Sequence, residues 1–271
     1  MERAGAWVVV AIGLMIVAAI AYFGLKRTEP PPTEPPRAAA PAPEAVPEQA
    51  APRHESGPQI RYPAPTEQKG AQAPQEGEAG LWNAVVGLLG DKSLEALLNR
   101  QDFVPRVVAT VDNLPRRKLP QRLTPVKLPG GTLVVIGEGN NAVLSPANAA
   151  RYERYLRLME AVDTRTLLDV YARYYPLFQQ AFRELGYPNG YFNDRVVEVI
   201  DDMLAAPELR EAARLDQPKV YYIFEDPALE ALSAGQKMLI RIGPLNAAKA
   251  KAKLREIRKE LVSQTGKQME R

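Results

Sequence analysis

The distribution of apolar residues predicts a membrane anchor at the start of the chain. Residues 6–25 carry no charge, and at about 1.5 Å per residue a helix of this length spans the roughly 30 Å of a bilayer's hydrocarbon core. Lys26 and Arg27 end the apolar run, which predicts a single transmembrane helix within an anchor over residues 1–27. Ala19-Ile20-Ala21 also fits a signal-peptide cleavage site, but the apolar run continues past it, which favours an uncleaved anchor.

A proline-rich stretch over residues 28–80 follows the predicted anchor. Thirteen of the 25 prolines lie between Pro30 and Pro74, and large apolar residues are almost absent there. Proline contributes no backbone donor to a helix or sheet, and so few apolar side chains cannot bury enough surface to fold. We expect a disordered tether that reaches at most about 150 Å at about 3.1 Å per residue. It is either an inert linker or a spacer that holds the domain away from the membrane.

Large apolar residues return at helical spacing over residues 81–263, which predicts one mostly helical domain, with a disordered tail over 264–271. Residues that favour helix starts precede the apolar runs, namely Asp102, Ser145, Asp163, Asn193 or Asp194, Asp226, Ser233 and Asn246. One helical face is marked by Leu167, Tyr171, Tyr174, Phe178 and Phe182. Because Pro176 lies within that run, we expect a kink or a break there.

Short apolar runs rich in β-branched residues add a small β element. Residues 132–136 and 142–144 read as two strands around the turn Gly139-Asn140-Asn141, and residues 219–224 as a third strand. The expected fold class is therefore mainly α: an N-terminal transmembrane helix, a disordered proline-rich tether, and a single helical domain with a small β-hairpin or short sheet.

Composition excludes several kinds of site. The chain has no cysteine, which excludes disulfides, thiolate metal sites and cysteine nucleophiles. Its one histidine, His54, lies in the proline-rich stretch, so the domain holds no Ser-His-Asp triad and no multi-histidine metal site. We therefore expect no catalytic residue, no cofactor site and no metal site, with carboxylate chemistry as the catalytic class left open.

The carboxylates that could support such chemistry are Asp194, Glu198, Asp201 and Asp202, which share one predicted helix. Spacings of three and four residues place pairs of them on one face, where they could hydrolyse a glycoside or hold calcium. The spacing is unspecific, and we favour a solvated acidic face or an electrostatic partner for a basic helix of the same fold. In a hydrolase, the proton-donating acid would be Glu198 or Asp202.

Positive charge gathers at the C-terminal end of the chain. Between Gly235 and Arg271 ten Lys or Arg accompany three Glu, a local charge of +7 in a chain whose total is only +3. An apolar seam with helical steps is formed by Ala247, Ala250, Leu254, Ile257 and Leu261. The candidate partner-binding residues are Lys237, Arg241, Lys249, Lys251, Lys253 and Arg255.

This basic surface has two interpretations. It is a solvated face that complements the helix dipole, or it is a docking surface for an acidic protein or an anionic polymer. We do not expect nucleic acid as a partner, because the total charge is modest and an anchor precedes the domain. Nine of the eleven tyrosines lie between Tyr152 and Tyr222, and we expect them mainly in the core. Trp82 is the only tryptophan of the domain, which argues against a glycan-binding platform.

Four stretches carry a resemblance to a known family: RYERYLRLMEAVDT, YARYYPLFQQAFRELGYPNGYFND, VIDDMLAAPEL and VYYIFEDPALEALSAGQKMLIRIGPLNAAKAKAKLREIR. Over most of residues 90–262 they resemble a bacterial family of domains of unknown function, numbered 3014. The resemblance implies the layout described above, with one membrane helix, a proline-rich spacer and then the domain. It implies no activity, ligand or catalytic residue.

These observations predict a noncatalytic scaffold or adaptor of the bacterial cell envelope. We expect a single-pass protein of the inner membrane, anchored through residues 6–25, with its domain in the periplasm. Its expected partner is an envelope protein or an anionic envelope polymer, bound through the C-terminal basic residues. The alternative is a carboxylate-dependent hydrolase, or a binder, of an envelope polymer such as peptidoglycan.

Overall fold

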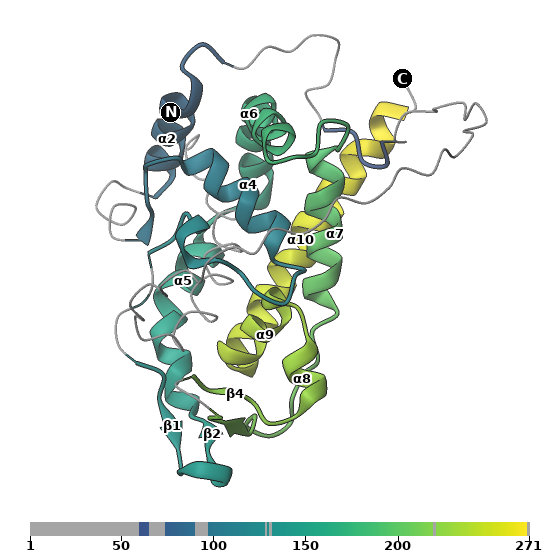
Figure 1. Cartoon of the computed structure of the whole chain (residues 1–271). Coiled ribbons are helices and arrows are strands. Elements are labelled where there is room, and N and C mark those ends of the chain that lie inside the picture. Colours follow the sequence, from purple (N-terminus) through teal and green to yellow (C-terminus); the bar gives the residue numbers. More distant parts are fainter. Residues whose placement is uncertain are drawn as a thin grey trace, which may run out of the picture.

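The computed structural model describes residues 60–64, 74–89, 97–127, 129, 132–218 and 221–269, without the side chains of residues 89, 140 and 264–269. Within these residues the chain forms eight α-helices and two short hairpins (Figure 1). The helices are α2 (Gly77–Leu89), α4 (Phe103–Asn113), α5 (Glu153–Ala161), α6 (Thr164–Glu184), α7 (Phe192–Leu204), α8 (Pro227–Ala231), α9 (Ala234–Arg241) and α10 (Pro244–Met269). The predicted membrane anchor lies outside the described residues, and none of the described helices is long and apolar enough to cross a membrane.

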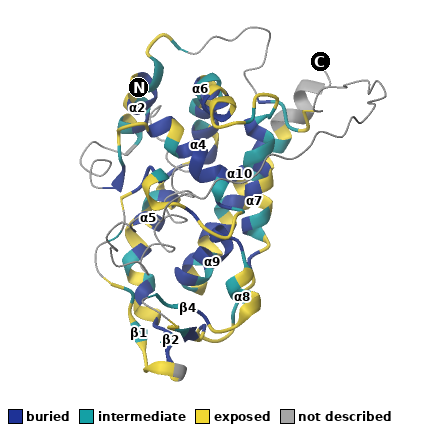
Figure 2. Cartoon of the chain, in the orientation of Figure 1, coloured by how far each residue is buried: buried dark blue, intermediate teal, exposed yellow. Residues whose placement is uncertain are grey.

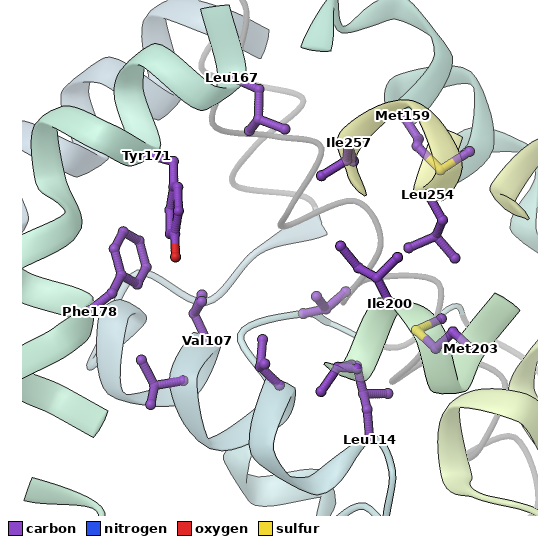
Figure 3. Close-up of a cluster of buried hydrophobic side chains, with 14 of the residues drawn as sticks. Val107, Leu114, Met159, Leu167, Tyr171, Phe178, Ile200, Met203, Leu254 and Ile257 are labelled. Carbon is purple, nitrogen blue, oxygen red and sulfur yellow. The ribbon is translucent and has the colours of Figure 1, made fainter. Parts of the chain in front are cut away.

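Helices α4, α6, α7 and α10 form the centre of the domain. α4 packs on α6 and α7, and α10 lies alongside α5, α6, α7 and α9 (Figure 1). Their inward faces are buried and their outward faces exposed (Figure 2). Figure 3 shows apolar side chains converging from α4, α5, α6, α7 and α10, among them Val107, Met159, Leu167, Ile200 and Leu254. The apolar seam predicted for α10 is confirmed, because Ala250, Leu254, Ile257 and Leu261 are all buried.

Helix α6 runs without interruption past Pro176, so the break that its sequence allowed is absent. Proline removes one backbone donor and crowds the preceding turn, which costs about 3 kcal/mol in a helix interior. Buried aromatic side chains lie on both sides of the proline, including Tyr174 and Phe178, and the helix packs on α2, α4, α7 and α10. We attribute the continuity of α6 to this burial, which holds both halves of the helix against the same core.

Several predicted helix caps are confirmed. The side chain of Ser145 accepts the backbone N–H of Ala147 at 3.2 Å, although the first turns after it are a 3-10 helix that passes into α5. Asp163 caps α6 and Asp226 caps α8 through side-chain bonds of the same kind. Ser233 forms the expected capping box at the start of α9.

Other predicted caps are wrong, because tertiary contacts supply the bond instead. Asp102 precedes α4 but has a φ of 52° and makes no side-chain capping bond. The carboxylate of Glu78, from α2, accepts the backbone N–H of Val104 at 3.2 Å in its place. Helix α7 begins at Phe192, so Asn193 and Asp194 lie inside its first turn. Their side chains bind another segment of the chain, which is described below.

Two antiparallel hairpins, β1–β2 and β3–β4, lie at the end of the domain away from α2 (Figure 1). Strands β1 (Val135–Ile136) and β2 (Val143–Leu144) fall within the predicted pair, and β4 (Ile223–Phe224) within the third predicted strand. The partner of β4 is β3 (Leu215–Asp216), which was not predicted. Gly137 has a φ of 83°, and a Cβ there would lie 2.5 Å from a backbone oxygen of the turn, so the turn requires glycine.

The structure extends the domain beyond both boundaries that the sequence suggested. Helix α2 begins at Gly77, and residues 60–64 pack on the domain although both fall within the predicted tether of 28–80. At the other end, α10 continues to Met269, so residues 264–269 are helical rather than part of an unstructured tail.

Candidate functional site

Two of the predicted partner-binding residues are buried within the domain. The side chain of Lys237 is 4% exposed, and its ammonium group donates to the carboxylate and the backbone carbonyl of Glu230, at 2.9 and 3.0 Å. Arg241 is also buried, and its guanidinium carbon lies 5.1 Å from the ring centre of Phe224. Both cations therefore hold α9 against α8 and the β3–β4 hairpin.

A third predicted contact residue, Lys251, is buried on α10. Its ammonium group donates to the backbone carbonyl of Ala206 at 2.6 Å and pairs with Glu208 at 3.2 Å. The side chain of Lys251 is 5% exposed, whereas that of Glu208 is 78% exposed. The carbonyl of Ala206 is therefore the partner that matters, because the exposed carboxylate is well solvated. This contact ties α10 to the chain that leaves α7.

The remaining three predicted residues differ in their surroundings. Lys249 pairs with Glu160 of α5 at 3.1 Å, and Lys253 donates to the backbone carbonyl of Val162 at 2.7 Å. Arg255 is exposed, and its side chain makes no ion pair or hydrogen bond within the described part of the chain. The structure thus assigns intramolecular contacts to five of the six predicted residues and leaves Arg255 facing solvent.

The acidic residues of α7 also have partners within the domain. Asp194 and Glu198 both bind residues 60–64, the first through backbone N–H groups and the second through an ion pair. Asp201 forms a two-point ion pair with Arg258 of α10. The expectation that this acidic helix pairs with the basic C-terminal helix is therefore confirmed at Asp201.

Asp202 of α7 contacts α9. Its carboxylate accepts the hydroxyl of Ser233 at 2.6 Å, and its backbone carbonyl accepts the side-chain amide of Gln236 at 2.8 Å. Burial raises the pKa of the Asp202 carboxyl, and the hydrogen bond from Ser233 acts in the opposite direction. The carboxylate thus serves the junction between α7 and α9.

The tyrosines form an internal aromatic cluster, as expected. Tyr171 and Tyr175 are buried, with ring centres 5.6 Å apart in an edge-to-face arrangement. The hydroxyl of Tyr171 donates to the amide oxygen of Asn193 at 3.1 Å, and that of Tyr175 donates to Gln179 at 2.7 Å. Burial raises the pKa of both tyrosines, so each hydroxyl keeps its proton and remains a donor.

The described part of the domain carries a polar groove that the sequence did not predict. It lies between α2 and two short paired segments, residues 97–99 and 125–127, and has a volume of about 750 Å³. Its lining consists of Trp82, Asn83, Val86, Leu98, Asn99, Arg100, Gln101, Arg106 and Lys127. A smaller hollow of about 470 Å³ shares Trp82, Arg100 and Gln101 with it, which extends the groove toward Asp102.

The chemistry of this groove centres on Arg100. Its guanidinium carbon lies 5.7 Å from the ring centre of Trp82, which packs edge to face on Phe103. Trp82 is 6% exposed, so only a small part of the indole reaches the groove. A guanidinium beside an aromatic ring is attracted to the ring and can still donate to a planar acceptor such as a carboxylate. The groove therefore presents an oriented cation beside side-chain amides.

The wall opposite α2 is fixed by hydrogen bonds. The backbone N–H of Asn99 donates to the carbonyl of Pro125 at 2.7 Å, and Arg106 donates to the carbonyl of Gln101 at 3.0 Å. The run Asn99-Arg100-Gln101-Asp102 is a cluster of polar residues directly before a buried helix, and that is the one sequence signal that could have indicated the groove. The walls come together only through tertiary contacts.

Comparison with known proteins places the chain in a family without giving it an activity. No curated protein and no solved structure matches the chain. The family model described as "Protein of unknown function (DUF3014)" matches residues 103–258, more than half of the chain, and spans α4 to the middle of α10. These are the helices that form the core and that hold the predicted basic residues. The chain therefore belongs to the DUF3014 family.

Proposed function

We propose that this protein is a noncatalytic adaptor of the bacterial cell envelope, anchored in the inner membrane by residues 6–25, with its helical domain in the periplasm. The domain binds another envelope protein through the groove between α2 and residues 97–102. The observation that supports this best is Arg100, an exposed residue that lines the polar groove with its guanidinium carbon 5.7 Å from the ring centre of Trp82. It replaces the C-terminal basic residues as the proposed contact, because five of those six bind within the domain.

The groove favours an acidic segment of the partner. Arg100, Arg106 and Lys127 line the larger part of the groove, which contains no carboxylate among its lining residues. Glu78 and Asp102 line the smaller hollow, where Glu78 is already engaged in capping α4. A carboxylate of the partner would accept two hydrogen bonds from Arg100, and Asn83 and Gln101 would donate to its backbone.

The hydrolase alternative has less support. Asp194, Glu198 and Asp201 are held by hydrogen bonds or ion pairs that build the fold, and Asp202 faces α9. None of the four lines the groove. A pair of catalytic carboxylates requires one proton donor and one ionised partner on the two sides of a substrate cleft, and the α7 carboxylates are not placed in this way.

A second candidate function is binding, without cleavage, of an envelope polymer such as peptidoglycan. Asn83, Asn99 and Gln101 offer amide donors and acceptors along the groove, which suits a ligand rich in hydroxyl, amide and carboxylate groups. The same cation, Arg100, would bind the carboxylates of such a polymer. The two candidates therefore differ in the ligand and share the site.

Site-specific photo-crosslinking of the full-length protein in cells tests the proposal. A photoreactive residue replaces Asn83 in the groove, and a matched variant carries it at Ala252 on the exposed face of α10. We expect a defined protein adduct from position 83 that is lost when Arg100→Glu is added. Adducts with peptidoglycan fragments at position 83 would support the second candidate. Adducts from position 252 alone, or none from 83, would overturn the groove as the contact surface.

A further inference from the structure

Residues 60–64, in the sequence Ile-Arg-Tyr-Pro-Ala, are bound by the start of α7. The carboxylate of Asp194 accepts the backbone N–H groups of Arg61 and Tyr62, at 3.0 and 2.7 Å. The amide of Asn193 donates to the carbonyl of Tyr62 at 2.9 Å. The backbone N–H of Ala64 donates to the hydroxyl of Tyr191 at 2.6 Å. The segment is the short blue stretch beside the start of α7 in Figure 1.

Side chains of the segment add to these backbone contacts. The guanidinium of Arg61 forms an ion pair with Glu198, which also pairs with Arg195 at 3.3 Å. Ala64 is fully buried and Tyr62 packs partly buried against the main core. Because protein interiors are closely packed, a larger side chain at Ala64 would have to displace its neighbours, so burial as well as hydrogen bonds holds the segment.

The side chain of Asn193, which binds the segment, is itself held in place by the core. Asn193 is 0% exposed, and its amide oxygen accepts the hydroxyl of Tyr171. Its amide nitrogen is left to point toward the segment, where it donates to Tyr62. Without the segment this donor and the carboxylate of Asp194 would lose the partners that residues 61 and 62 give them within the fold. The start of α7 is thus built to hold an extended peptide.

We propose that this clasp, made of Tyr191, Asn193, Asp194 and Glu198, is a peptide-binding site that the chain fills with its own residues 60–64. The bound segment is a strap that fastens the proline-rich stretch to the domain. The contacts of residues 60–64 are enough to support the strap. Its effect on how far the domain can reach from the membrane rests on the proposed membrane anchor. With the strap bound, only residues 28–59 of the predicted tether would separate the anchor from the domain, so its maximum reach would be about 100 Å rather than about 150 Å at about 3.1 Å per residue.

Trypsin digestion of the full-length protein in detergent tests the strap, because Arg61 lies within it. Arg53 and Lys69 lie outside residues 60–64 and serve as internal references for the rate of cleavage. Cleavage requires an unbound extended chain, so a docked segment is cut only in proportion to the fraction that is released. We expect cleavage after Arg61 to be at least about tenfold slower than after Arg53, which corresponds to docking by about 1.4 kcal/mol.

Two variants test whether the protection of Arg61 comes from the contacts between the strap and the clasp. Asp194→Ala removes the acceptor for both backbone N–H groups and should bring cleavage after Arg61 to the rate at Arg53. Ala64→Gln, which enlarges the strap and leaves the clasp unchanged, should do the same. The matched control Asp169→Ala, at an exposed site of α6, should leave the protection intact. Mass spectrometry of the fragments gives the three rates in each sample.

Equal cleavage after Arg61 and Arg53 in the unaltered protein would overturn the proposal. So would protection at Arg61 that persists in Ala64→Gln. The readout involves no partner, so the strap can fail while the groove proposal stands. Failure of the crosslinking experiment likewise leaves the cleavage pattern unaffected.

Discussion

Replacing Lys251 by methionine removes a buried positive charge and keeps most of the apolar stem that packs on α7. The ammonium group of Lys251 donates to the carbonyl of Ala206 at 2.6 Å, in a side chain that is 5% exposed. A hydrogen bond that involves a charged group contributes about 1.5–3 kcal/mol, and the carbonyl left behind would be unpaired. The ion pair with exposed Glu208 adds little, about 0–1 kcal/mol. We therefore expect a loss of about 2 kcal/mol in the free energy of unfolding.

Arg255→Met is the matched control, because it removes a positive charge from the same helix at an exposed position. A surface substitution of this kind changes stability by less than about 0.5 kcal/mol. For a domain of this size a loss of about 2 kcal/mol lowers the midpoint of thermal unfolding by about 4–8 °C, and the control should shift it by less than about 2 °C.

Thermal unfolding of both full-length variants in detergent, followed by far-ultraviolet circular dichroism, measures the difference. Equal midpoints for Lys251→Met and the unaltered protein would refute the assignment of Lys251 to the fold. In that case Lys251 would be available to a partner, which is one of the two interpretations that the sequence allowed.

Two further substitutions test the packing and the electrostatics of the core. Leu254→Ala, at a fully buried position of α10, should cost about 2–5 kcal/mol in urea denaturation, and a loss under about 1 kcal/mol would contradict the packing in Figure 3. Burial raises the pKa of Asp202 above its ordinary value of 3.8, so the folded state holds the proton more tightly than the unfolded state. The stability that this protonation contributes is present below pH 3.8 and is lost as pH rises through the raised pKa. The stability of Asp202→Asn relative to the unaltered protein should therefore increase as pH rises from about 3.8. A difference in stability between Asp202→Asn and the unaltered protein that does not change with pH would refute the raised pKa of Asp202.

The periodicity of apolar residues was sufficient to predict most helices, since helical spacing places them on one face wherever that face packs. The seam of α10 and the buried face of α6 followed directly from the order of residues. The break predicted at Pro176 was the exception. Proline disfavours a helix interior locally, but the packing of residues on both sides of it keeps α6 continuous. The caps at Ser145, Asp163 and Ser233 were predictable for the same reason as the helices, since a cap binds a backbone group two or three residues away.

The groove and the strap could not be predicted in this way, because each joins residues far apart in the chain. Arg100 lies beside Trp82 of α2, and the segment just before it pairs with residues 125–127. Asp194 was predicted to start a helix or face solvent, and instead it binds residues 61 and 62, more than 130 positions earlier. A segment of five residues in a proline-rich stretch is too short to have a periodicity that could indicate a docked conformation.

The sequence by itself determined where the helices form, which faces they bury and which chemistries are excluded, because propensity, periodicity and residue type act over a few positions. It also determined that positive charge gathers near the C-terminus. Whether each charge is free was decided only by the tertiary structure, because the partner of a cation depends on which distant carbonyl or carboxylate folding brings within about 3 Å. Lys251 and Arg255 lie four residues apart on one helix, yet one is buried on a backbone carbonyl and the other faces solvent.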